Sequence, residues 1–211
     1  MQDKKIKIFN ILDRGVHEED RIIKDYEKLE QIVHMFKIEE KNVVFVQGTF
    51  DLYHVGHAKY LEKAKAFGDL LVVAVDTDEF VKLRKGPTRP IVDLEERLAI
   101  LVRDRSVDIL TVLHSKDSAD ELIKKIKPDV LVLSVTTRDK PNFIEDMKKK
   151  LGDSVGTIEV LEPQAETSTS ARVRFLALDG ASELSLKMKK VIDEHFEMNG
   201  QIHKEEVPNE K

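Results

Sequence analysis

Apolar runs of strand length alternate with segments of helical periodicity over most of the chain. Five runs are rich in Val, Ile and Leu with little polar alternation: Val43–Val46, Leu70–Val75, Ile109–Leu113, Val130–Leu133 and Thr157–Leu161. Strands buried on both faces of a parallel sheet have this composition. The segments of helical length between them cover residues 57–67, 93–103, 118–127 and 141–151. The alternation predicts an α/β fold, a Rossmann-like open parallel sheet of about five strands with helices on both faces.

Two amphipathic segments flank this alternation. Residues 18–38 carry an apolar stripe at helical spacing, which predicts one helix packed on the core. Its members are Ile22, Tyr26, Leu29, Ile32, Val33 and Phe36. Residues 181–197 predict a second such helix, and the polar end of the chain is expected to be disordered. The expected parts are an N-terminal helical extension over 1–41, a main domain over 42–180, a C-terminal helix over 181–200 and a disordered tail over 201–211. The two amphipathic helices also predict a homodimer.

Composition narrows the classes of partner. Charged residues make up 36% of the chain, but the signs are mixed, the net charge is -5 and no basic block occurs, so nucleic acid is not an expected partner. The absence of cysteine excludes disulfides, thiolate metal sites and a cysteine nucleophile. No apolar run approaches the roughly 18 residues of a membrane span, and the Lys-rich start lacks the apolar core of a signal peptide. We expect a cytoplasmic protein without membrane association.

The segment from Gly48 to His57 carries the most chemical information. His54 and His57 lie between an apolar strand and a predicted helix, beyond the carboxyl end of the strand, where ligands bind in open parallel sheets. Free N–H groups of a helix start and two imidazoles suit an anion, above all a phosphate. We expect Gly48 to permit a tight turn and Gly56 to permit close approach of a ligand. The alternative is that one histidine caps the helix and the other is a packed side chain.

Basic residues form a second candidate element. Residues 84–90 contain a glycine and two prolines, which predict a loop whose cations could close over phosphates. An ordinary solvated surface loop is the alternative. Arg97 lies at the border of the apolar stripe of the 93–103 helix. It could reach into the site, lie over the stripe or pair with a neighbouring carboxylate.

Hydroxyl and carboxyl groups supply the remaining candidates. Residues 167–170 are four consecutive hydroxyl residues that follow the last strand and open a helix, where they could cap it, bind phosphate or do both. Asp51 and Asp78 lie near strand ends. Either could orient a histidine, help to hold Mg²⁺ or cap a turn.

Several of these motifs together resemble a known family. Gly48-Thr49-Phe50-Asp51 followed by His54-Val55-Gly56-His57 resembles the signature of the cytidylyltransferase-like nucleotidyltransferases, and the resemblance covers roughly residues 20–178. The stretch from Lys85 to Ile91 is most similar to adenylyltransferase domains that activate heptose 1-phosphate. Residues 48–51 and 76–80 resemble glycerol-3-phosphate cytidylyltransferase equally well. The resemblance implies that a substrate phosphate oxygen attacks the α-phosphorus of a nucleoside triphosphate and that pyrophosphate leaves. Mg²⁺ would be bound mainly through triphosphate oxygens.

The resemblance also implies roles for individual residues. The catalytic set is His54, His57, Lys85 and Arg97. The nucleotide-binding set is Gly48, Thr49, Phe50, Gly56, Ser168, Thr169, Ser170 and Arg174. The substrate-binding set is Asp51, Asp78, Arg84 and Arg89.

The acceptor and the base are less well defined. Residues 134–139 replace a glycine-rich stretch of the heptose-type enzymes, and residues 163–166 replace a lead-in of the glycerol-phosphate enzymes. We favour ATP as the nucleotide and a small phosphorylated sugar or polyol as its acceptor. The alternatives are a CTP-dependent alditol-phosphate enzyme and a catalytically silent nucleotide-binding sensor.

Overall fold

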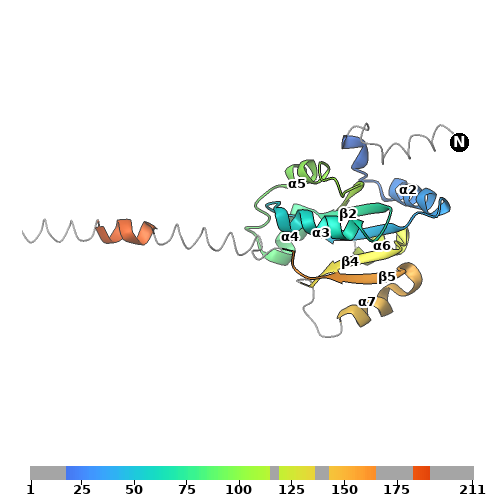
Figure 1. Cartoon of the computed structure of the whole chain (residues 1–211). Coiled ribbons are helices and arrows are strands. Elements are labelled where there is room, and N and C mark those ends of the chain that lie inside the picture. Colours follow the sequence, from blue (N-terminus) through green and yellow to red (C-terminus); the bar gives the residue numbers. More distant parts are fainter. Residues whose placement is uncertain (1–17, 115–118, 136–142, 165–182, 191–211) are drawn as a thin grey trace, which may run out of the picture. The chain divides into compact units, whose positions relative to one another are not determined.

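A five-stranded parallel sheet forms the centre of the computed structural model, which describes residues 18–114, 119–135, 143–164 and 183–190. The strands are β1 (Val43–Gly48), β2 (Leu70–Asp76), β3 (Ile109–Leu113), β4 (Val130–Ser134) and β5 (Thr157–Leu161), in the order β3-β2-β1-β4-β5. Helices cover both sides of the sheet (Figure 1), which confirms the predicted Rossmann-like α/β fold. The strand order changes direction at β1, so the switch point lies between β1 and β4.

Alternate residues of each strand enter two separate cores. In β1, Val43 and Phe45 pack with α2 (Tyr26–Ile38), α6 (Ala119–Ile126) and α7 (Phe143–Leu151), whereas Val44 and Val46 face α3 (Val55–Lys65) and α5 (Leu94–Leu101). All four of these strand residues are fully buried. A strand buried on both faces needs apolar residues at successive positions, which explains the continuous apolar runs in the sequence.

Within the described residues, the α-helix α4 (Asp78–Lys85) was not predicted from the sequence pattern. The Thr77 hydroxyl accepts a hydrogen bond from the Phe80 N–H and caps its start. Gly86, at a φ of 97°, ends it. The predicted loop over 84–90 was therefore wrong at its beginning, because Arg84 and Lys85 belong to the last turn of this helix.

The predicted single helix over 18–38 was wrong at its start. Residues Glu18–Arg21 form a 3₁₀ turn, and the Ile23 N–H donates to the Leu110 carbonyl at 2.7 Å. Ile22 forms a parallel bridge with Leu110, so this segment covers the outer edge of β3. The helix proper, α2, begins at Tyr26 because the Asp25 carboxylate caps it.

The apolar side chains of α2 are buried in the hydrophobic core. Leu29, Ile32, Val33 and Phe36 are all buried against the sheet, so this stripe does not support a dimer interface. Residues 183–190 form a helical segment with exposed Leu184, Leu186 and Met188. Contacts divide the chain into residues 1–166 and 167–211. The predicted boundaries at 41, 180 and 200 stay predictions, and the predicted tail over 201–211 lies outside the described residues.

None of the helices in the described ranges combines the length and the apolar character that crossing a lipid bilayer requires.

Candidate functional site

The turn between β1 and α3 lies at the carboxyl end of β1, beside the switch point. Phe50 and Leu52 adopt left-handed backbone conformations, with φ of 52° and 49°. Each costs roughly 1–2 kcal/mol, and such strain concentrates at functional sites. A Cβ on Gly48 would lie 2.8 Å from the Phe50 ring. Gly48 thus makes room for this ring, and its expected role in a tight turn stays a prediction.

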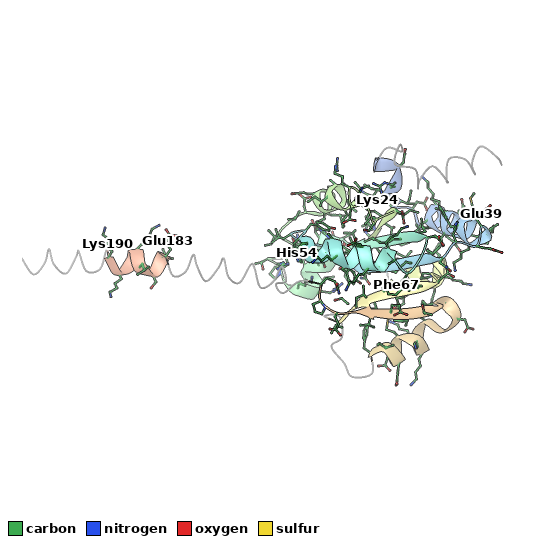
Figure 2. All side chains as sticks on the ribbon, in the orientation of Figure 1. Lys24, Glu39, His54, Phe67, Glu183 and Lys190 are labelled. Carbon is green, nitrogen blue, oxygen red and sulfur yellow. The ribbon has the colours of Figure 1, made fainter. Side chains whose placement is uncertain are left out.

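The two histidines stack at the start of α3. The His54 Nδ1 accepts a hydrogen bond from the Gly56 N–H at 3.0 Å, so His54 caps the helix. Figure 2 labels His54 on the part of the chain that contains the sheet. The His57 ring lies parallel to the His54 ring, with 4.0 Å between ring centroids and 22° between planes. The alternative interpretation, in which one histidine caps the helix and the other is a packed side chain, also describes His54 and His57. They nevertheless bring two imidazoles together where free helix N–H groups converge.

Burial, followed by electrostatic interaction with His54 and with the Lys85 ammonium, lowers the pKa of His57 to about 4. His57 is therefore neutral near pH 7, with one N–H available as a donor. Its Nδ1 is buried and has no hydrogen-bond partner among the residues that the structure describes.

A hydrogen-bonded relay joins the end of α4 to the turn after β1. The Lys85 ammonium donates to the Thr49 hydroxyl at 3.1 Å, and that hydroxyl donates to the Asp76 carboxylate at 3.0 Å. Asp76 is fully buried at the end of β2, and it also accepts from Arg84 at 2.9 Å and from Gln47 at 2.8 Å. Neither Asp76 nor Gln47 was among the predicted site residues. The available signal was a carboxylate at the end of an otherwise apolar buried strand.

Lys85 lies in a cationic environment. Burial, followed by the guanidinium groups of Arg84 and Arg89, lowers its pKa. Its ammonium contacts a neutral hydroxyl, whereas Arg84 pairs directly with Asp76. An incoming anion would relieve this crowding.

Asp51 clamps the segment that follows α4. Its carboxylate accepts hydrogen bonds from the Ile91 and Val92 N–H groups at 3.0–3.1 Å and forms a 2.6 Å ion pair with Arg89. Burial alone would raise the pKa of Asp51, but the two N–H groups and Arg89 outweigh it and lower the pKa. Asp51 and Arg89, both expected to bind substrate, are therefore bound to each other.

Arg97 is buried, although its position in the sequence suggested a border. Its guanidinium donates to the Thr49 carbonyl at 2.6 Å and to the Val92 carbonyl at 3.1 Å, and pairs with Asp78 at 2.6 Å. The carboxylate-pairing alternative describes its contact with Asp78, and the bond to Thr49 brings it to the turn after β1. Helix α5 thereby holds this turn in place.

Some predicted site residues lie outside the described ranges. They are Ser168, Thr169, Ser170 and Arg174. Over the described ranges, no group of three His, Asp or Glu side chains is arranged to hold a metal ion. The carboxylates of Asp51 and Asp78 are already engaged, so they offer no preformed Mg²⁺ site.

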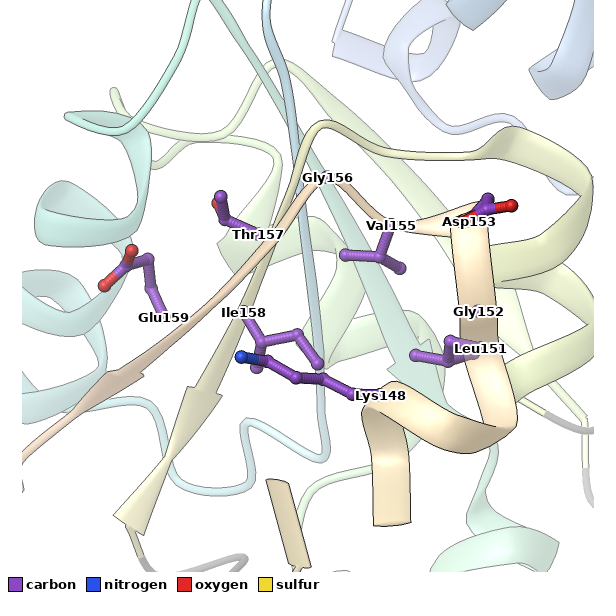
Figure 3. A pocket seen from close by; sticks show the side chains of 9 residues that line it. All are labelled: Lys148, Leu151, Gly152, Asp153, Val155, Gly156, Thr157, Ile158 and Glu159. Carbon is purple, nitrogen blue, oxygen red and sulfur yellow. The ribbon is translucent and has the colours of Figure 1, made fainter. Parts of the chain in front are cut away.

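A groove of about 620 Å³ lies between α7 and β5 (Figure 3). Its lining runs from Lys148 to Glu159 and includes the start of β5. In a parallel sheet the amino ends of the strands lie opposite the carboxyl ends, so this groove is separate from the histidine site.

Comparison with known proteins agrees with this geometry. The family described as Cytidylyltransferase-like matches residues 45–175, more than half of the chain. The bifunctional protein HldE of Sulfurimonas denitrificans is 47% identical over 113 residues, which is 54% of this chain and 24% of that protein. HldE of Nitratiruptor sp. is 37% identical over 155 residues, 74% of this chain and 32% of that protein. The chain thus matches only a quarter to a third of the length of these relatives.

A solved structure supports the fold alone. The pantoate-beta-alanine ligase of Francisella tularensis superimposes with a TM-score of 0.53 at 18% identity, covering 71% of this chain and 68% of that one. With the stacked histidines at the switch point of the sheet and the family match over residues 45–175, the chain belongs to the cytidylyltransferase-like family of nucleotidyltransferases.

Proposed function

We propose that this chain transfers a nucleoside monophosphate from ATP to a small phosphorylated sugar, with release of pyrophosphate. Family membership supports nucleotidyl transfer. The preference for ATP rests on the stretch from Lys85 to Ile91, which is similar to that of heptose 1-phosphate adenylyltransferases. Relatives named bifunctional protein HldE support the same choice of acceptor class.

The observation that carries the proposal is the pattern of charge pairing around the turn after β1. Each of three arginines has an aspartate partner: Arg84 with Asp76, Arg89 with Asp51 and Arg97 with Asp78. Lys85 instead contacts a neutral hydroxyl, and the imidazole of His57 lies close enough for the charge of Lys85 to lower its pKa. Burial and neighbouring cations lower the pKa of both groups. A phosphate bound between them would supply the missing anion.

The reaction needs donors and a fixed geometry more than a protein nucleophile. An oxygen of the acceptor phosphate forms a bond to the α-phosphorus, and the bond from that phosphorus to the bridging oxygen breaks. Pyrophosphate leaves with the bonding electrons. Charge develops on the oxygens around the α-phosphorus, where an N–H of neutral His57 and the N-terminus of α3 would stabilise it. Lys85 would hold the departing phosphates, as a cation at the end of α4.

Mg²⁺ would be held mainly by the oxygens of the triphosphate, because the nearby carboxylates are committed to protein partners. When bound, the ion would neutralise charge on the leaving pyrophosphate.

Pyrophosphate release tests the proposal. The protein is mixed with ATP or CTP and with heptose 1-phosphate, mannose 1-phosphate or glycerol 3-phosphate. Release with ATP and a sugar 1-phosphate is the expected result. Release confined to CTP with glycerol 3-phosphate would assign the alditol-phosphate reaction instead. Nucleotide binding without release for any pair would indicate a sensor.

A homodimer also stays a proposal. Its support is the exposed apolar set Leu184, Leu186 and Met188 in the helical segment 183–190. Light scattering at micromolar concentration measures the mass directly, and a monomeric mass would contradict a dimer.

A further inference from the structure

The orientation of His57 depends on its aromatic neighbours. Ring nitrogens of functional histidines are usually oriented by a hydrogen bond from the second nitrogen to a carbonyl or carboxylate. The buried Nδ1 of His57 lacks such a partner within the described residues. Three rings surround it instead: His54 stacked at 4.0 Å, Phe50 edge-on at 5.5 Å and Tyr53 tilted by 31° at 5.5 Å. Packing against these three rings therefore orients the imidazole of His57, as a hydrogen bond does in other proteins.

Two of these rings are fixed locally. His54 is held by its cap bond to the Gly56 N–H, and Phe50 is buried over Gly48. Tyr53 is held by a residue remote in the sequence, because its hydroxyl donates a hydrogen bond to the Oδ2 of Asp104, 51 positions along the chain. Burial, followed by the hydrogen bond and charge of Asp104, raises the pKa of Tyr53, so it remains a neutral donor.

Asp104 is itself a rigid anchor. Its Oδ1 accepts from the Ser106 N–H at 2.8 Å, and its own N–H donates to the Leu101 carbonyl at 3.0 Å. It therefore forms the turn that ends α5. Arg97 of α5 holds Thr49, so α5 and the turn that follows it bind the turn after β1 at residues 49 and 53.

We propose that Tyr53 and Asp104 are positioning residues that set the imidazole of His57 in its reactive orientation, through the hydrogen bond that the Tyr53 hydroxyl donates to Asp104 in the turn after α5. The effect on catalysis rests on the proposed nucleotidyl transfer, whereas the effect on the His57 ring does not. The pair acts on the reaction through the His57 ring. Its contribution is geometric: a displacement of about 1 Å can cost up to 10²-fold in rate.

Four variants test the pair. Tyr53→Phe removes the hydroxyl and keeps the ring. Asp104→Ala removes the acceptor, and Asp104→Asn keeps an oxygen that can accept. The double variant Tyr53→Phe/Asp104→Ala reports coupling, because residues that act through one bond are not additive. Tyr60→Phe is the matched control, since Tyr60 lies on α3 with His57 and its hydroxyl donates to the Val132 carbonyl of β4.

The first readout is the His57 resonance in protein labelled at histidine Cε1, assigned with His57→Gln. Tyr53→Phe and Asp104→Ala are expected to shift or broaden it, whereas Tyr60→Phe leaves it unchanged. The second readout is steady-state pyrophosphate release with ATP and a sugar 1-phosphate. We expect kcat to fall about tenfold in Tyr53→Phe, with KM for ATP changed less than about threefold. The double variant is expected to match the single ones, and Asp104→Asn to recover most of the rate.

An unchanged His57 resonance in folded Tyr53→Phe would overturn the proposal, as would a loss of rate in Tyr60→Phe equal to that in Tyr53→Phe. If the wild-type protein releases no pyrophosphate, the proposed reaction fails, and the resonance alone still decides the role of Tyr53. If Asp104→Ala does not fold, Tyr53→Phe and Asp104→Asn carry the test.

Discussion

Arg97 and Asp78 form a 2.6 Å ion pair in which the arginine side chain is 1% exposed. The pair joins α5 to the start of α4, and the other guanidinium nitrogens hold the Thr49 and Val92 carbonyls. A buried cation that is bonded to three partners is a structural element of the site.

Arg97→Ala should destabilise the fold. It leaves the Thr49 carbonyl and one oxygen of Asp78 without their donor, and because the Asp78 side chain is 32% exposed we expect a loss of about 1–3 kcal/mol. Urea unfolding followed by circular dichroism measures the loss. Lys24→Ala is the matched control, because Lys24 and Glu95 form an exposed 3.0 Å pair, 54% and 76% exposed, whose removal should change little. Equal, small effects in the two variants would contradict a clamping role for Arg97.

Asp51→Ala should release the segment that follows α4. The substitution removes the acceptor of the Ile91 and Val92 N–H groups and the partner of Arg89. Trypsin should then cut the Lys85–Gly86 bond much faster than in the wild-type protein, as measured by mass spectrometry of timed samples. Asp25→Ala removes the cap of α2 at a cost of about 1 kcal/mol and serves as the control for general destabilisation. Equal cleavage at Lys85 in both variants would show that Asp51 does not act locally.

Stability should fall as the pH drops from 6.5 to 4. The pKa of His57 is about 4 in the folded protein and 6.5 when unperturbed. Between these two pH values His57 is protonated in the unfolded chain and neutral in the folded protein. The free energy of unfolding therefore increases with pH in this range and decreases on acidification. Urea midpoints at intervals of pH measure the slope. His57→Gln should flatten it, and exposed His34→Gln should keep it. An unchanged slope in His57→Gln would contradict the lowered pKa.

The sheet was predictable because burial on both faces leaves a strong local signal. All five strands were found from runs such as Ile109–Leu113, which has the same bounds in the structure. The start of α2 was not predictable in the same way. Ile22 fits an apolar helical stripe and an edge bridge to Leu110 equally well, and the choice depends on a strand far along the chain. Helix α4 was missed because it is short and highly charged, with Val81 as its buried residue.

The residue types of the site could be predicted from the sequence, but the partners that its charged side chains bind could be predicted less well. The position of His54 before a helix and His57 in its first turn followed from local sequence, and the structure has both. The pairing of Asp51 with Arg89 and of Asp78 with Arg97 depends on how α4 and α5 pack, which no local pattern encodes. Tyr53 was missed for the same reason, since its partner Asp104 lies at the end of another helix.

Transfer of labelled phosphorus tests the central claim most directly. The protein is incubated with a sugar 1-phosphate and with ATP labelled either at the α- or at the γ-phosphorus, and the products are separated by chromatography. We predict that the α-label enters a sugar nucleotide and that the γ-label is recovered entirely in pyrophosphate. His57→Ala should slow this transfer by about 10²–10³-fold, whereas His34→Ala should not. Transfer of the γ-label to the sugar, or an unchanged rate in folded His57→Ala, would contradict attack at the α-phosphorus in the histidine site.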